Sequence, residues 1–171
     1  MSFDLILVGT DAAGDERQVA ALIERTLLGL GARGKSAEGL FVLADGALLE
    51  MSLEATALHL SIRDDTQVVM AAIFAMAEAT QAFIVPVENP LAIRTPANHR
   101  VPADADVEGL EVVEAADVAA LAQHLSGGYG DWSDYRDQVV SQSPPAPPPP
   151  IAPAPPAPVK KGWFASLFSK S

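Results

Sequence analysis

The residue types best suited to catalysis gather in one stretch of the sequence, between positions 89 and 100. Amide, imidazole and guanidinium side chains transfer protons or hold anions when a fold brings them together. The members of this polar set are Asn89, Arg94, Asn98, His99 and Arg100. Their spacing matches no catalytic motif, so three interpretations stay open: an enzymatic site, an anion contact and a solvent-exposed loop.

A second chemical signal matches the phosphate-loop pattern of glycine, four residues and Gly-Lys-Ser. Its candidate nucleotide contacts are Gly29, Gly34, Lys35 and Ser36. A phosphate loop follows a strand and opens a helix, because backbone amides and the helix dipole must converge on the phosphates. Here the flanking patterns predict a helix before the segment and a strand after it. The candidate is therefore weak, and a glycine-rich helix stop is the alternative interpretation.

The sequence indicates neither a metal centre nor cysteine chemistry. The three histidines, His59, His99 and His124, have no carboxylate at a familiar metal-ligand spacing, and the chain has no cysteine. No two acidic residues are spaced as an acid/base couple. We therefore expect no catalytic residue, no metal and no cofactor, and we expect His59 on the solvent side of its strand.

A basic aromatic tail, residues 159–171, follows a spacer rich in proline. Ten of the 14 prolines fall between Ser143 and Pro158, a stretch without charge. This composition predicts an extended spacer of up to roughly 50 Å, at about 3.1 Å per residue. In the tail, large apolar side chains at i, i+1, i+4 and i+5 would form one face of a helix with lysines at its ends. The residues concerned are Lys160, Lys161, Trp163, Phe164, Leu167, Phe168 and Lys170.

The tail resembles the membrane-targeting tail of the MinD family of bacterial Min-system ATPases. The shared features are a Lys-Lys-Gly run before a hydrophobic pair and a later Leu-Phe pair, and they cover only Lys160 to Lys170. The resemblance implies reversible membrane binding through the four apolar side chains, with the lysines facing anionic head groups. The rest of the chain lacks that family's nucleotide loop after the first strand, so the resemblance implies no ATPase activity. A groove on another protein is the alternative receptor.

The net charge of the chain changes sign at Ser143. All 22 acidic residues precede it and three of the 11 basic residues follow it, so the body carries 8 − 22 = −14 and the tail +3. A body this acidic repels nucleic acid and anionic lipid, and it attracts a basic partner. We therefore expect a protein partner and no nucleic acid, with a homo-oligomer as an open alternative.

Hydrophobic periodicity predicts the elements that position these residues. The first half of the chain is expected to contain a buried strand 3–8, a helix from Asp15 to about 30, a hairpin of 40–44 and 47–53 around Asp45-Gly46, and a strand 56–62. A helix from Thr66 to about 81 and a strand 83–87 are expected to follow. The remaining elements are a loop 89–106, a short strand 110–113 and a helix capped by Asp117. Pro86 indicates an edge strand or a strand end. This order predicts an α+β two-layer sandwich with a mostly antiparallel sheet and helices on one face.

Three regions follow from these patterns. Residues 1–142 form an acidic α+β domain, residues 143–158 a linker, and residues 159–171 the tail. A possible closing helix contains Tyr129, Trp132, Asp134 and Tyr135, a set that fits a protein interface or packing on the core equally well. The longest apolar run is shorter than the roughly 20 residues of a membrane span, and no secretory signal is visible, so we expect a cytoplasmic protein that the tail can bring to the inner face of the membrane.

The leading functional hypothesis is a non-catalytic adaptor, whose acidic domain binds a protein and whose tail docks on a membrane or a second partner. One alternative is an immunity-type protein that neutralises a basic toxin or nuclease, since small size and high acidity suit that role. Another is a small enzyme that uses the loop of Asn98, His99 and Arg100, or a nucleotide binder that uses Lys35.

Overall fold

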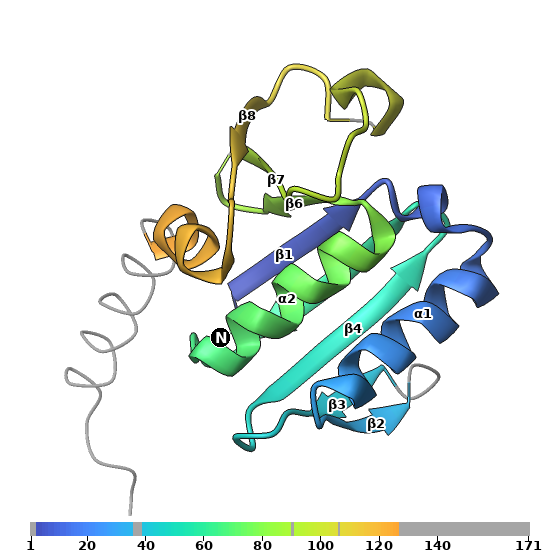
Figure 1. Ribbon diagram of the computed structural model, residues 1–171, viewed down its shortest axis with the longest axis vertical. Helices are drawn as coiled ribbons and strands as arrows, with labels where there is room; N and C mark the ends of the chain where they lie inside the picture. Colours follow the sequence, from blue (N-terminus) through green and yellow to red (C-terminus); the bar gives the residue numbers. More distant parts are fainter. Residues whose placement is uncertain (1–2, 36–38, 90, 106, 127–171) are drawn as a thin grey trace, which may run out of the picture. The chain divides into compact units, whose positions relative to one another are not determined.

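The computed structural model describes residues 3–35, 39–89, 91–105 and 107–126, all of which belong to one compact unit, Met1–Ser141. Within these ranges, eight strands form one sheet in the order β2-β3-β4-β5-β1-β6-β7-β8 (Figure 1). The strands are β1 (Phe3–Val8), β2 (Arg33–Lys35), β3 (Leu40–Val42), β4 (Leu48–Glu54), β5 (Ala57–Ile62), β6 (Phe83–Pro86), β7 (Leu91–Arg94) and β8 (Glu111–Glu114). Every neighbouring pair is antiparallel except β7 and β8, which are parallel.

Helices cover one face of this sheet. They are α1 (Glu16–Gly29), α2 (Gln67–Thr80) and a third helix at residues 118–126. Figure 1 shows α1 and α2 side by side across the sheet, and all three helices bury apolar side chains in the same core. The result is the α+β two-layer arrangement that the sequence predicts. No helix in the described ranges combines the length and the apolar composition that a membrane crossing requires.

Buried and exposed side chains alternate along the central strands, and this alternation distinguishes the two faces of the sheet. In β5, Leu58 and Leu60 are buried under the helices, whereas His59 between them is exposed on the outer face, as predicted. A smaller second core lies at the β6–β8 end, where Ala105 and Val107 pack on Phe83. The segment between β7 and β8, which contains the 3₁₀ helix η3 (Pro102–Ala105), thus packs against this end of the sheet.

Asp45 links the β3–β4 turn to the start of α2. Its Oδ1 accepts a hydrogen bond from the Ala47 amide at 3.0 Å, and its Oδ2 accepts one from Thr66 Oγ1 at 2.5 Å. The same Thr66 hydroxyl caps α2 by accepting from the Val69 amide at 3.2 Å. Gly46 completes the turn with φ of 90°, a value that glycine adopts without strain. The predicted hairpin and helix cap are therefore one connected structure.

Replacing Thr66 with valine is expected to raise the pKa of Asp45 and to weaken the pH dependence of stability. The Thr66 hydroxyl, and after it the Ala47 amide, hold the pKa of the Asp45 carboxyl below its usual value. A carboxyl with a lowered folded-state pKa stabilises the protein above its unfolded pKa, and this stabilisation is lost as the pH falls from about 4 through the folded pKa. An NMR titration of the Asp45 carboxyl carbon, with urea unfolding at both ends of that range, measures both effects. Thr66→Ser keeps the hydroxyl and is the matched control; equal titration curves for the two variants would contradict the assignment.

Two strands lie where the sequence predicts none. The expected loop from 89 to 106 contains β7, which pairs with β6 on one side and β8 on the other, so the prediction of a continuous loop is wrong. The segment interpreted as a glycine-rich helix stop after α1 contains β2, which pairs with β3. Pro86 is the last residue of β6, an inner strand between β1 and β7, so the strand-end interpretation is correct and the edge interpretation is wrong.

Candidate functional site

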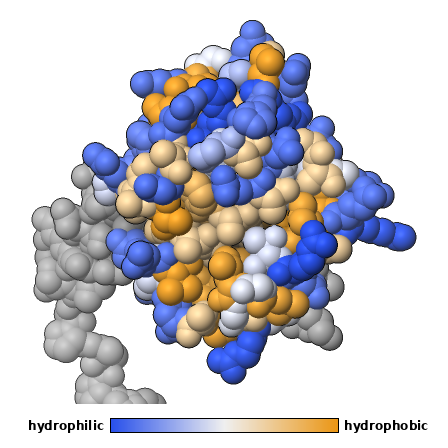
Figure 2. All heavy atoms as spheres, viewed as in Figure 1, coloured by the Kyte–Doolittle hydropathy of each residue, from blue (hydrophilic) through white to orange (hydrophobic). Residues whose placement is uncertain are grey.

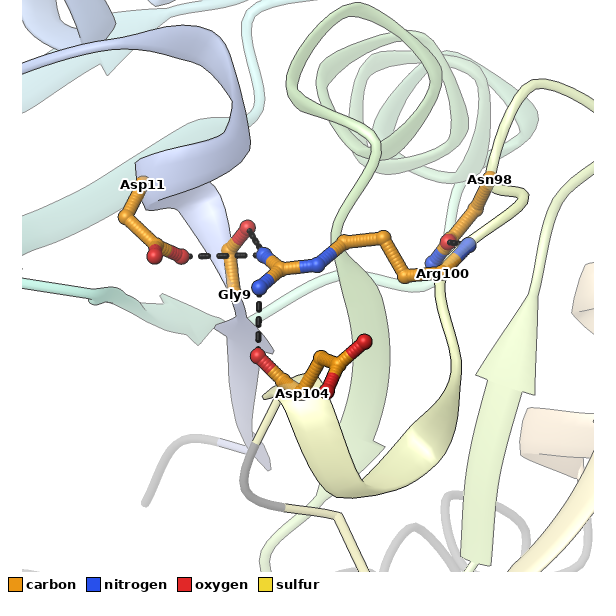
Figure 3. A network of polar contacts seen from close by, with 5 residues as sticks. All are labelled: Gly9, Asp11, Asn98, Arg100 and Asp104. Atoms are coloured by element: carbon orange, nitrogen blue, oxygen red, sulfur yellow. Dashed lines mark hydrogen bonds and ion pairs between the residues drawn. The ribbon is translucent and has the colours of Figure 1, made fainter.

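Arg100 joins three segments near the carboxyl end of β1 (Figure 3). Its Nη1 donates to the backbone oxygen of Gly9 and, at 2.9 Å, to Asp11 Oδ1. Its Nη2 donates to the backbone oxygen of Asp104. Gly9 directly follows β1, Asp11 lies in the 3₁₀ helix η1 (Thr10–Ala13) and Asp104 lies in η3. The Arg100 side chain is only 16% exposed, whereas that of Asp11 is 48% exposed, so the contact with the buried Gly9 is better shielded from water than the contact with Asp11.

The residues around this network fit a structural role. Gly9 has φ of 86°, and a Cβ there would lie 2.6 Å from Arg100 Nη1, so a larger residue would displace the guanidinium. Asn98 Oδ1 accepts a hydrogen bond from the Arg100 amide at 2.9 Å, which fixes the turn before the arginine. Arg100 therefore acts as a clamp between segments of the fold.

A pocket of about 380 Å³ lies where β7 and β8 end. The two strands are parallel and in register from Leu91 with Glu111 to Arg94 with Glu114, so both chains leave the sheet at the same edge. Three members of the predicted polar set line this pocket, namely Arg94, Asn98 and His99. Asn89 and Arg100 are not among its lining residues.

Two polar residues of the pocket were not singled out by the sequence, Thr95 and Glu114. Arg94 Nη2 donates to Glu114 Oε1 across the parallel strands. Thr95 and Asn98 are each 2% exposed, and Thr95 Oγ1 and Asn98 Nδ2 have no hydrogen-bond partner among the described residues. Only the pairing of β7 with β8 brings Glu114 beside Arg94, and the sequence carries no signal for that pairing.

The three histidines lie in different environments. His59 is exposed on β5, with Nε2 3.9 Å from Glu54 Oε2, and His99 is exposed beside the β7–β8 pocket. His124 is in the third helix, with Nε2 3.2 Å from the backbone oxygen of Glu114. In the part of the chain that the structure describes, no three His, Cys, Asp or Glu residues are arranged to hold a metal ion.

The phosphate-loop-like segment has a helix before it and a strand in place of its loop. Gly29 is the last residue of α1, and Gly34 and Lys35 belong to β2. Gly34 has φ of 143°, and a Cβ there would lie 2.4 Å from the Leu40 backbone oxygen, so the close pairing of β2 with β3 accounts for this glycine. Ser36 lies outside the described residues. The described backbone of this segment is therefore not the strand–loop–helix of a phosphate loop.

The outer face of α2 is apolar. Val68, Ala71, Phe74, Ala75 and Ala79 are half-buried on this helix, between the fully buried positions that face the sheet. Glu78 is the only charged residue from Gln67 to Thr80. Figure 2 shows the helical face of the domain, with a band of apolar surface bordered by hydrophilic side chains. A helix that faced only water would carry polar residues along this stripe.

The other predicted contacts lie outside the described residues. These are the aromatic and acidic set Tyr129, Trp132, Asp134 and Tyr135, and the tail residues Lys160, Lys161, Trp163, Phe164, Leu167, Phe168 and Lys170.

Comparison of the chain with protein-family models, with curated proteins and with solved structures gives no match.

Proposed function

We propose that this protein is a non-catalytic adaptor that binds a protein partner through its α+β domain and docks on a membrane surface through its basic aromatic tail. The observation that carries the first part is the apolar outer face of α2. Val68 and Phe74 on this face also pack against the core, but a row of half-buried apolar side chains along a surface helix is typical of protein-binding surfaces. The small alanine side chains along this face would let a partner helix approach closely.

The composition of α1 beside this face also supports a docking surface. A shallow depression of about 490 Å³ on α1 is lined by Ala20, Ala21 and Leu28, with Arg17 and Arg25 at its sides. Leu28 is 47% exposed, a high value for a large apolar side chain. Apolar contacts bordered by charged groups are the usual composition of a protein interface.

The tail supports the second part of the proposal. Four large apolar side chains contribute about 1.5–3 kcal/mol each when buried, and each lysine adds about 1 kcal/mol at an anionic surface. These gains are opposed by the cost of ordering a short helix and by repulsion of the acidic body from anionic lipid. A single tail therefore binds weakly, and a partner that is already on the membrane would strengthen the attachment through a second contact.

Co-sedimentation with lipid vesicles tests the membrane part of the proposal. The intact protein is expected to sediment with phosphatidylcholine vesicles that contain phosphatidylglycerol, and less with phosphatidylcholine alone. Trp163→Ser combined with Phe164→Ser is expected to abolish binding to both, because the variant loses half of the apolar contacts. Lys160→Gln with Lys161→Gln is the matched control, since it should remove only the preference for anionic lipid. Absence of the intact protein from both pellets would contradict membrane docking and would favour a protein groove as the receptor.

A further inference from the structure

The pocket at the ends of β7 and β8 is lined by residues whose polar groups are not fully paired. Among the described residues, the Arg94 guanidinium has one acceptor, Glu114, and Asn98 Nδ2 and Thr95 Oγ1 have none. The Asn98 carbonyl is already used by the Arg100 amide, so the orientation of its amide group is fixed with Nδ2 unpaired. A ligand that satisfies this set must offer acceptor oxygens.

The unpaired buried groups of the pocket lower the stability of the free protein. A buried polar atom without a partner costs about 1–3 kcal/mol, and Thr95 and Asn98 are two such residues lining one pocket. Most buried polar groups of folded proteins are paired with protein, water or ligand, so two adjacent exceptions require an explanation. Both atoms are buried, so a ligand oxygen reaches them only when the loop shifts, and a hydrogen bond formed in this way would recover part of the cost.

The charged groups of the pocket favour a ligand with a single negative charge. The Arg94 side chain is 32% exposed and lies deeper than that of Glu114, which is 72% exposed. A carboxylate can share the planar guanidinium through two parallel hydrogen bonds. Glu114 at the rim repels a ligand with more negative charge, such as a phosphate dianion.

His99 also lines the pocket, and the apolar walls come from Pro96, Ala115 and Ala116. They suit the carbon atoms of an organic molecule, and a volume of about 380 Å³ is within the range of small-ligand sites. The pocket lies beyond the carboxyl ends of the two parallel strands. We infer that the pocket binds a small organic monocarboxylate, held by Arg94 and by the loop that contains Thr95 and Asn98.

NMR titration of the full-length protein with three probes, pentanoate, benzoate and pyruvate, tests this inference. At least one probe is expected to shift the backbone signals of residues 94–99 and 114–116 in a saturable way at millimolar concentrations. The corresponding amides, pentanamide, benzamide and pyruvamide, keep the size of the probes but lose the charge. They are expected to bind at least tenfold more weakly.

Three variants separate binding from stability. Arg94→Gln is expected to weaken binding of the carboxylate at least tenfold, whereas Arg63→Gln, which breaks the comparable Arg63–Glu50 ion pair away from the pocket, is expected to leave binding unchanged. Thr95→Val keeps the shape of the side chain and removes the unpaired hydroxyl. It is expected to weaken binding several-fold without lowering the melting temperature of the free protein, because the hydroxyl has no partner there.

Three results would overturn the inference. The first is the absence of saturable shifts at this pocket with all three carboxylates. The second is equal binding of the carboxylates and their amides. The third is a Thr95→Val variant that is destabilised while it binds the carboxylate as well as the unchanged protein does, which would give Thr95 a purely structural role.

Discussion

Replacing Arg100 with alanine is expected to lower the free energy of unfolding by about 3 kcal/mol. The change removes the hydrogen bonds to Asp11 and to the backbone oxygens of Gly9 and Asp104. Hydrogen bonds that involve a charged group contribute about 1.5–3 kcal/mol each, and removal of the guanidinium leaves the backbone oxygen of the buried Gly9 without this donor. The clamp joins the end of β1 to η1 and η3, so the variant should also loosen the segment between β7 and β8.

Urea unfolding and amide hydrogen exchange measure these two effects. Arg63→Gln is the matched control, because the Arg63–Glu50 separation of 2.7 Å is close to the Arg100–Asp11 separation of 2.9 Å, whereas the Arg63 and Glu50 side chains are 60% and 44% exposed. Exposed ion pairs contribute about 0–1 kcal/mol, so this variant should change stability little. Arg100→Lys should recover only part of the loss, since one ammonium group does not reproduce the geometry of the guanidinium. A similar small loss for Arg100→Ala and Arg63→Gln would refute the clamp.

Substitutions on the two faces of α2 are expected to change the stability of the protein by very different amounts. Ile73→Ala should lower the free energy of unfolding by about 2–5 kcal/mol, because Ile73 is fully buried in the main core and the change leaves a cavity. Ala75→Lys on the outer face should change it by less than about 1 kcal/mol, since the lysine can extend into water and pair with Glu78 one turn later. Urea unfolding of both variants gives the comparison.

The same outer-face variant tests the adaptor proposal. A photo-crosslinking residue at position 79 should form a defined adduct in cells, and Ala75→Lys should reduce its yield because a charge disrupts an apolar contact. The crosslinker at Ala57, on the opposite face of the sheet, is the matched control. An adduct that is unaffected by Ala75→Lys, or that forms equally from position 57, would contradict partner binding by the outer face of α2.

Local patterns were sufficient to predict most of the elements. The Asp15 capping box marks the start of α1, because the Asp15 and Gln18 side chains each bond to the other's backbone amide at 2.9 Å. Asp45-Gly46 marks the hairpin, and alternation marks β5. These signals are visible in the sequence because the interactions that produce them join residues close together in the chain.

The pairings that shape the pocket and the clamp depend on distant residues. β2 reads Arg-Gly-Lys and shows no apolar alternation, so only its pairing with β3 makes it a strand. β7 is a strand because β6 and β8 flank it. Arg100 contacts Gly9 and Asp11, 91 and 89 residues earlier in the chain. The sequence therefore identified Arg94, Asn98 and His99 as a polar group but could not predict that Thr95 and Glu114 join them.

The two edges of the sheet carry opposite charges, and this bears on self-association. Among the described residues, one edge is β2, which contains Arg33, and the other is β8, which contains Glu111 and Glu114. Unpaired backbone groups of an edge strand can recruit a strand from another molecule. Like edges of two molecules repel one another, which disfavours symmetric edge-to-edge dimers. An unlike pair would attract, but β2 has only three residues, so it offers too short a template for the growth of a continuous intermolecular sheet.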